Sequence, residues 1–296
     1  MVKRIKLSQK SIDTYDSIMA MLDTLIGTTK PEMYLNASNI IKKIQDSDYS
    51  LNSKKMLIVV AEKIAKGNNK SKQLDDAISL YSSTITSMNN TINLEISKNT
   101  LSEKEKKKFI TLDEIIAVRN KLLKRYHKSN LKSDYIDYML VSLYTMFPPR
   151  RVIDFCLMKI ANKLDETTDK EHNFLLVSDK KMEFIFNRYK TDFAYGTQKF
   201  DVPKDLEKVL RYWIEKYQQG EYLLQYKPSY EPNENNLTKY MIRLFDAEAG
   251  KPAGISVLRH AYISHFNNKK MTVEQRKDIS SKMAHSIFLQ LEYAKE

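Results

Sequence analysis

The chain has 296 residues, a length that fits two compact domains better than one. Its hydrophobic fraction of 42% suffices for folded cores, and six glycines with seven prolines exclude a collagen-like or low-complexity chain. Because 49 lysines and arginines face 37 acidic residues, the formal charge is +12, which favours a polyanionic partner such as nucleic acid or an anionic membrane surface.

Membrane, metal and nucleotide-hydrolysing classes find no support in the sequence. The longest apolar run, Met56–Ala61, is far too short for a membrane span, and the charged start of the chain lacks a following apolar region. The single cysteine, Cys156, lies in the apolar stretch Val152–Ile160 and is expected in the core. A lone cysteine cannot form an internal disulfide, which fits a reducing intracellular compartment. No Cys/His cluster or glycine-rich phosphate loop is present, so we expect no metal or cofactor.

The first hundred residues predict a small domain of short amphipathic helices, residues 1–100. Apolar residues share a helix face at Ile18, Leu22, Leu25 and Ile26, then at Ile40, Ile41 and Ile44, and again over Met56–Ile64. The following segment is polar and highly charged, which indicates a linker over residues 101–110.

A second domain is expected over residues 111–296 and begins with a helix. Thr111 is a plausible N-cap with Glu114 three residues on. A second helical stretch, Tyr135–Phe147, should end at Pro148–Pro149 because proline cannot donate the helical hydrogen bond. Another helix should follow from Arg151.

Between residues 174 and 202 the pattern changes to short runs rich in β-branched and aromatic residues. Phe174–Val177, Met182–Asn187 and Lys199–Val202 predict a small antiparallel sheet, with Gly196 supplying a turn before the last strand. Helical periodicity returns from Leu206, interrupted by a loop over residues 227–236. The predicted fold class is therefore mainly α with a small antiparallel β-sheet.

Four separated motifs occur in this second domain: Arg151–Asp154, Lys190–Thr191, Ser256–His260, and Ala284–Ser286 followed by Tyr293. Their order is that found in tyrosine recombinases, the family of phage and mobile-element integrases, which the chain resembles from about residue 111 to residue 293. The first motif, Arg151-Val-Ile-Asp154, resembles the family's Arg-x-x-Glu/Asp element. A guanidinium holds two phosphate oxygens at once, and Asp154 would steady it. The bland alternative is an ion pair at a helix start, and Arg150 is the neighbouring rival.

The second motif, around Lys190-Thr191, resembles the family's β-hairpin lysine. The resemblance implies that Lys190 enters the minor groove and protonates the departing 5′ oxygen as general acid. An exposed hairpin lysine is more often merely solvated, and Lys199 is the alternative candidate.

The third motif, Ser256-Val-Leu-Arg259-His260, resembles the family's His-x-Leu-Arg-His, with Arg259 as the second phosphate clamp and Leu258 packed inward. Ser256 stands where histidine is usual. Its hydroxyl can still donate a hydrogen bond to a phosphate oxygen but carries no positive charge.

The fourth motif, Ala284-His285-Ser286 followed by Tyr293, resembles the family's Gly-His-Ser segment and its nucleophile. His285 would donate to a phosphate oxygen and Tyr293 would attack phosphorus. Ala284 replaces the usual glycine, and eight residues separate His285 from Tyr293 where nine are common. On its own, a tyrosine at such a position more often packs than reacts.

The resemblance implies a helical N-terminal DNA-binding domain joined to a catalytic domain, which together clamp double-stranded DNA. The implied activity is site-specific recombination or integration through a 3′-phosphotyrosyl intermediate, by a homotetramer assembled on DNA and without metal. A type IB topoisomerase-like enzyme and a catalytically inactive DNA-binding relative are the alternatives. The abundance of lysine, asparagine and isoleucine suggests an A/T-rich genome, such as that of a virus or mobile element.

Overall fold

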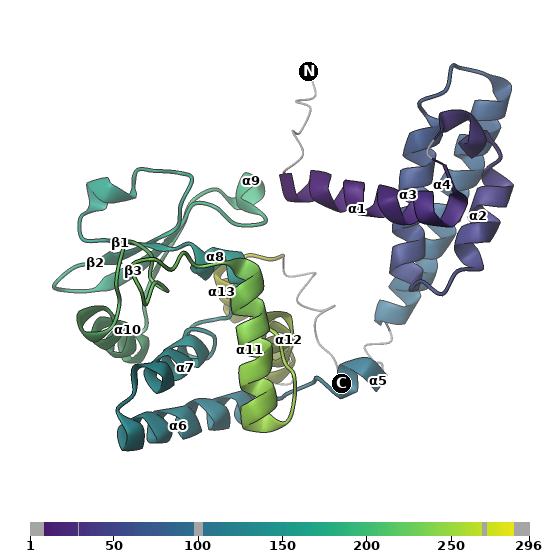
Figure 1. Cartoon of the computed structure of the whole chain (residues 1–296). Coiled ribbons are helices and arrows are strands. Elements are labelled where there is room, and N and C mark those ends of the chain that lie inside the picture. The colour runs from purple at the N-terminus through teal and green to yellow at the C-terminus, as the bar shows by residue number, and fades with distance from the viewer. Residues whose placement is uncertain (1–8, 29, 98–102, 268–270, 287–296) are drawn as a thin grey trace. The chain divides into compact units, whose positions relative to one another are not determined.

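The computed structural model describes residues 9–28, 30–97, 103–267 and 271–286, and it divides the chain into two compact units, 1–98 and 99–296 (Figure 1). Each unit has its own hydrophobic core. None of the helices in the described ranges is both long enough and apolar enough to cross a membrane.

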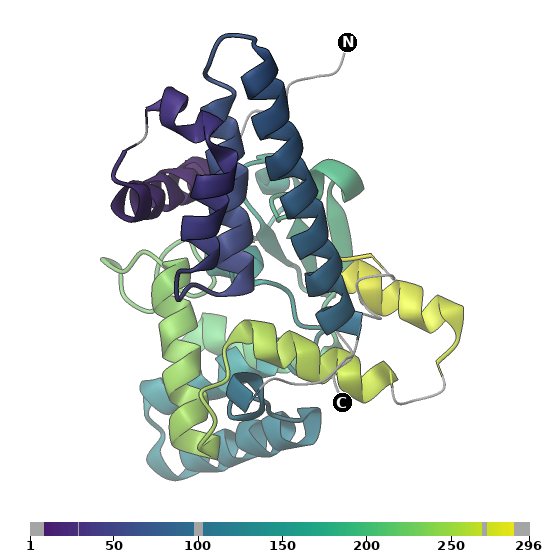
Figure 2. The same cartoon turned by 90° about the vertical axis from the view of Figure 1, so that its right-hand side faces the viewer.

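Unit 1 is entirely helical over its described residues. Its elements are α1 (Gln9–Ile26), a 3₁₀ turn η1 (Pro31–Leu35), α2 (Ala37–Gln45), α3 (Leu51–Ala65) and α4 (Lys72–Ser97). The predicted apolar faces are confirmed, because Leu22, Ile40 and Ile44 are buried in one core. The prediction of only short helices was wrong, since α4 has 26 residues and runs beside α3 (Figure 2).

Buried tyrosines join the elements of unit 1. The hydroxyl of Tyr81, on α4, donates to the carbonyl oxygen of Tyr34 at 2.9 Å, and the Tyr34 hydroxyl donates to that of Thr28 at 2.8 Å. Both rings are fully buried. The two hydroxyls therefore satisfy backbone groups that a purely apolar core would leave unpaired.

Unit 2 combines helices with one sheet. In chain order its elements are α5 (Glu103–Lys106), α6 (Leu112–Ser129), α7 (Lys132–Leu143), α8 (Val152–Cys156), β1 (Lys159–Ala161), η2 (Leu164–Thr167), β2 (Phe174–Val177), β3 (Met182–Phe186), α9 (Asp192–Tyr195), β4 (Gln198–Asp201), α10 (Lys204–Lys216), α11 (Glu234–Ala249), α12 (Ile255–Asn267) and α13 (Val273–Lys282). The short helix α5 occupies part of the predicted linker. Ile110, the last residue of that linker, is fully buried in the core of unit 2.

The predicted start of α6 is confirmed, whereas the predicted end of α7 is not. Thr111 caps α6 with a complete capping box, in which its backbone N–H donates to Glu114 at 2.8 Å. Helix α7, however, begins at Lys132 and ends at Leu143, so its predicted extension to Phe147 was wrong. Phe147 leaves the helix to pack against Phe184, with ring centroids 5.2 Å apart.

The sheet has four strands in the order β1-β2-β3-β4, and it is mixed rather than wholly antiparallel as predicted. Strands β2, β3 and β4 pair antiparallel, with Leu175 opposite Phe184 and Phe184 opposite Phe200. Strand β1 pairs parallel to β2. This strand was missed because three residues are too few to show an alternating pattern. Gly196 adopts φ +63° at the end of α9, as the predicted turn requires.

Helices α6, α7 and α11 are joined by charged side chains. Arg125 on α6 forms ion pairs with Asp134 and Asp137 of α7 and with Glu248 of α11.

Helix α11 begins at Glu234, inside the predicted loop, because the Asn233 side chain accepts hydrogen bonds from the first backbone N–H groups. Cys156 is fully buried as expected, and burial raises the pKa of its thiol to about 12.

Candidate active site

Arg151 is the N-cap residue of α8 and is half-buried. Its Nη1 donates to the carbonyl oxygen of Ala284 at 3.2 Å. This contact joins residues 133 positions apart in sequence. The first and fourth sequence motifs are therefore brought together in the fold.

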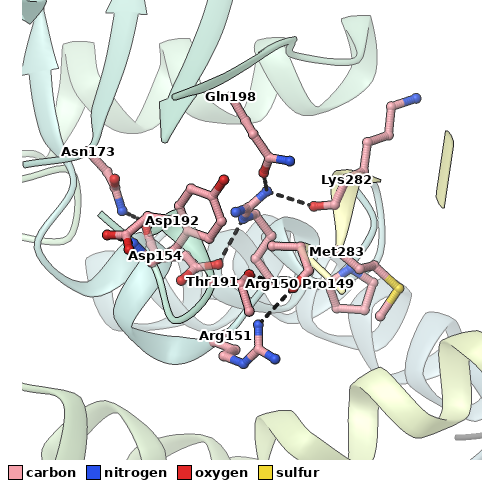
Figure 3. Close-up of polar contacts among 12 residues, drawn as sticks. Pro149, Arg150, Arg151, Asp154, Asn173, Thr191, Asp192, Gln198, Lys282 and Met283 are labelled. Carbon is pink, nitrogen blue, oxygen red and sulfur yellow. Dashed lines mark hydrogen bonds and ion pairs between the residues drawn. The ribbon is translucent and has the colours of Figure 1, made fainter. Parts of the chain in front are cut away.

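Asp154 does not hold Arg151, contrary to the prediction. Its Oδ2 accepts a hydrogen bond from Arg150 Nε at 2.8 Å, and both side chains are fully buried (Figure 3). Arg150 Nη1 also donates to Gln198 and to the carbonyl oxygen of Lys282, each at 3.0 Å. The guanidinium lies 3.8 Å from the centroid of the Phe186 ring. Arg150 is thus enclosed by protein, which leaves Arg151 as the accessible member of the pair.

Arg259 lies on α12 and is only 3% exposed. Its Nη1 donates to the carbonyl oxygen of Pro149, and Nη1 and Nη2 both donate to that of Met283, at 3.3 and 3.2 Å. Leu258 is buried, as predicted. Arg259 therefore lies against the turn that carries His285.

The turn after α13 gathers the three arginines. The carbonyls of Lys282, Met283 and Ala284 accept from Arg150, Arg259 and Arg151 respectively. The helix ends in a Schellman motif, since His285 N donates to Ser280 O at 3.1 Å and Ala284 N to Ser281 O at 3.0 Å. Ala284 has φ +52°, a left-handed conformation in which glycine is usual. This conformation explains why the resembled motif has glycine at this position.

His285 is 4% exposed, and its Nδ1 lies 3.1 Å from the carbonyl oxygen of Ser286. Burial, followed by the positive charges of Arg259 and Arg151, lowers the pKa of His285 to about 4. The imidazole is therefore neutral near pH 7, and its single N–H, on Nδ1, donates to the carbonyl oxygen of Ser286, which leaves Nε2 as an acceptor.

Lys190 is exposed in the turn between β3 and α9. The adjacent Thr191 Oγ1 donates to the carbonyl oxygen of Ala284 at 3.2 Å, so this turn is attached to the same backbone group as Arg151 (Figure 3). Lys199 is exposed on β4. A cavity of about 310 Å³ opens beside His285, and its lining includes Tyr195, Gln198, Lys277, Ser280 and Ser286.

Ser256, which lies among the described residues, makes none of the contacts that join this cluster. Ser256 is exposed in the first turn of α12, three residues before the buried Arg259. Tyr293 lies outside the described residues, and its role as nucleophile stays a prediction.

Sequence reasoning did not predict two parts of this site, namely the ion pair between Arg150 and Asp154 and the contacts of Gln198 and Thr191. The i,i+4 spacing of Arg150 and Asp154 on a helix start was a usable signal for their ion pair, although i,i+3 was equally open for Arg151. Gln198 and Thr191 carry no comparable signal, because their contacts cross 48 and 93 residues.

Comparison with known proteins supplies the fold. No protein-family model matches the sequence, and no curated protein matches it significantly. Among solved structures, the Tn1549 transposon integrase in complex with circular intermediate DNA matches with a TM-score of 0.58 at 12% identity, covering 99% of this chain and 91% of that one. The chain has the fold of a tyrosine recombinase.

The same integrase in complex with transposon right end DNA matches this recombinase fold with a TM-score of 0.57, at 12% identity and over 99% of this chain and 91% of that one. The crystal structure of XerA recombinase aligns at 13% identity over 98% of this chain and 88% of that one, with a TM-score of 0.44 that is too low to support a comparison of folds. The likeness thus supports, at the level of fold, the resemblance drawn from the four motifs.

Proposed function

We propose that this protein is a site-specific DNA recombinase or integrase that cuts and rejoins DNA through a covalent bond to Tyr293. The observation that carries the proposal is the convergence of Arg151, Arg259 and His285 on one turn, from three separated segments of the chain. The recombinase fold supports it independently.

Each residue has a defined task in the proposed reaction. Arg151 and Arg259 would donate to the non-bridging phosphate oxygens, where charge concentrates in the transition state. His285 would donate through Nε2 once it has gained a second proton, which a nearby phosphate favours, because its Nδ1 faces the carbonyl oxygen of Ser286. The Tyr293 hydroxyl would release its proton to solvent as its oxygen attacks phosphorus, and the 3′-phosphotyrosyl bond would form as the bond to the 5′ oxygen breaks. Lys190 would give that oxygen a proton. A 5′ hydroxyl of another strand would then attack the phosphotyrosine and restore the DNA.

Arginine donors that now bind backbone carbonyls would have to turn to the phosphate. Arg151 and Arg259 donate to Ala284 and Met283 in this state. A guanidinium is attracted more strongly to an anionic phosphate oxygen than to a neutral carbonyl oxygen, and it can hold two phosphate oxygens at once, so the exchange is favourable. These carbonyls would hold the two side chains close to their working positions before DNA arrives.

The second candidate function is a DNA-binding relative without catalysis. It is favoured by the 3% exposure of Arg259 and by the exposed, uncharged Ser256 in place of histidine. The two functions differ in one product, the covalent adduct between protein and DNA.

The deciding experiment uses nicked duplexes that lose their 5′-hydroxyl fragment after cleavage, so that the adduct cannot be reversed. Denaturing gels should show a covalent complex, and sequencing its DNA would map the target site. Tyr293→Phe should abolish the complex while binding stays close to wild type, because only the attacking oxygen is removed. An undiminished adduct in Tyr293→Phe would exclude this nucleophile, and no adduct in wild type would favour the inactive relative. Supercoil relaxation without strand exchange would indicate a type IB topoisomerase.

Mixing Tyr293→Phe with Arg151→Ala distinguishes two ways of delivering the tyrosine. Adduct formation by the mixture would mean that one protomer supplies Tyr293 to the arginines of another.

We further infer that the protein assembles on double-stranded DNA as a tetramer, acts inside the cell and belongs to a mobile element or virus. The DNA complexes of the Tn1549 integrase support the DNA-binding part of this inference.

A further inference from the structure

The loop between β3 and β4 exposes two aromatic side chains on the short helix α9. Phe193 is 84% exposed and Tyr195 is 47% exposed. Other aromatic residues of this hairpin have the opposite environment, since Phe184 and Phe186 are fully buried. Phe193 is also absent from the hydrophobic clusters formed by the described residues. At this exposure, its ring contributes little packing to the fold.

The backbone beneath these exposed rings is held firmly. At the base of the loop, the Tyr189 hydroxyl donates to the carbonyl oxygen of Gly196 at 2.6 Å, and the Tyr189 ring is buried beside the Arg150 guanidinium. Thr191 donates to the carbonyl oxygen of Ala284. Ala194 N donates to Thr191 O at 3.0 Å, which closes the helical turn that presents Phe193. The exposed ring is therefore presented from a fixed position two residues from a contact with the candidate active site.

Cationic side chains accompany the aromatic pair. Lys190 and Lys199 are exposed on either side of α9 in sequence. Arg188 is also exposed but forms ion pairs with Glu171 and Asp192, so the two lysines are the cations that this surface offers. A surface that alternates cations with exposed rings suits nucleic acid, because the cations attract phosphates and the rings stack on bases. A protein partner would more often be met by an apolar patch with few cations at its centre.

We propose that Phe193 is a DNA wedge, which inserts between neighbouring bases close to the phosphate held by Arg151 and Arg259. The proposal rests on the proposed function. Aromatic and aliphatic side chains that enter the base stack kink the duplex and unstack one step. Phe193 would open the duplex beside the cleavage point, and Tyr195 would lie along the displaced base. Since every base has a flat face, the contact would add affinity with little sequence preference.

The test compares wild type with Phe193→Ala and Phe193→Trp on a short A/T-rich duplex. Leu131→Ala is the matched control, because Leu131 is another exposed apolar residue of unit 2, at 57%. Permanganate oxidises thymines that are no longer covered by a neighbouring base, so it reports unstacking directly. Fluorescence anisotropy on the same duplex reports binding.

Wild type, Leu131→Ala and Phe193→Trp should each make thymines reactive. Phe193→Ala should return their reactivity to that of free DNA and weaken binding about tenfold, in line with the loss of one stacked base. Unchanged reactivity in Phe193→Ala overturns the wedge while leaving the proposed function intact. Normal unstacking combined with poorer assembly of several protomers on DNA would also overturn it and assign Phe193 to a contact between protein copies. If wild type does not bind the duplex, the proposed function fails and the wedge fails with it.

Discussion

Two adjacent arginines have contrasting environments. Arg150 is fully buried and forms an ion pair with Asp154, whereas Arg151 is half-buried at the start of α8. A buried ion pair adds little net stability, but removing one partner leaves the other charge without compensation in a medium of low dielectric constant. Arg150 therefore belongs to the framework of the site and Arg151 to its accessible surface.

Arg150→Gln should lower the free energy of unfolding by about 3 kcal/mol, because Asp154 would remain buried without its partner. Arg151→Gln should change stability by less than about 1 kcal/mol but reduce adduct formation about a hundredfold or more. Urea unfolding and adduct yield measure the two effects. The double variant Arg150→Met/Asp154→Leu is the control, since replacing both charges should recover part of the stability. Equal destabilisation by both single variants would contradict this division.

His285 makes stability depend on pH. Its pKa is lowered to about 4 in the folded protein, below the usual 6.5, so the unfolded chain binds its proton first as pH falls. The contribution of His285 is fully present above pH 6.5 and is lost as pH falls through the window down to 4, by up to about 3 kcal/mol.

His285→Gln should remove this slope, which urea unfolding at several pH values between those limits would reveal. Wild type with bound duplex should also show a smaller slope, because a nearby phosphate favours the charged imidazole. Identical slopes in wild type and His285→Gln would mean that other groups account for the pH dependence.

At the level of elements, the C-terminal turn of α13 is the critical junction. Arginines from the α8 region and from α12 bind its consecutive carbonyls, and Thr191 joins the β3–β4 loop to it. The carbonyls at the end of a helix have no partner within the helix, so they are natural acceptors for these donors. The left-handed Ala284 makes this geometry possible at some cost in conformational energy.

Substitution of Ala284 tests that turn. Ala284→Gly should leave stability within about 1 kcal/mol of wild type, because relief of the left-handed conformation offsets a lost buried methyl and a more flexible unfolded chain. Ala284→Val should cost about 2 kcal/mol or more, since a β-branched residue is strongly disfavoured there. Thermal unfolding measures both variants. A stable Ala284→Val would mean that the turn does not need its left-handed residue.

For the whole molecule, both units carry excess positive charge. Residues 1–100 contain 14 basic and 10 acidic side chains, so the remaining residues carry +8 of the total +12. We propose that both units bind one duplex. Binding measured at increasing salt should then weaken steeply, because contacts to several phosphates release counterions.

Limited proteolysis should cut between residues 99 and 108, and DNA should protect the cut. The comparison is residues 110–296 alone, which should bind duplex more weakly and with a shallower dependence on salt. Equal affinity of this fragment and the full chain would remove unit 1 from the DNA-binding surface.

Local chemistry was readable in the sequence without any structure. The capping box at Thr111, the buried faces of α1 and α2, strands β2 to β4 and the mainly helical class all follow from residues close together in the chain. The order of the four motifs pointed to the recombinase fold for the same reason, since each motif is only a few residues long.

Contacts between distant segments were decided by the tertiary structure. Sequence spacing allowed Asp154 to pair with either Arg150 or Arg151. In the folded chain it pairs with Arg150, because that side chain is buried against Phe186 and Gln198. The early end of α7 and the parallel strand β1 likewise depend on partners far away in sequence. Burial and hydrogen bonding are properties of the assembled neighbourhood, so no periodicity within one segment can specify them.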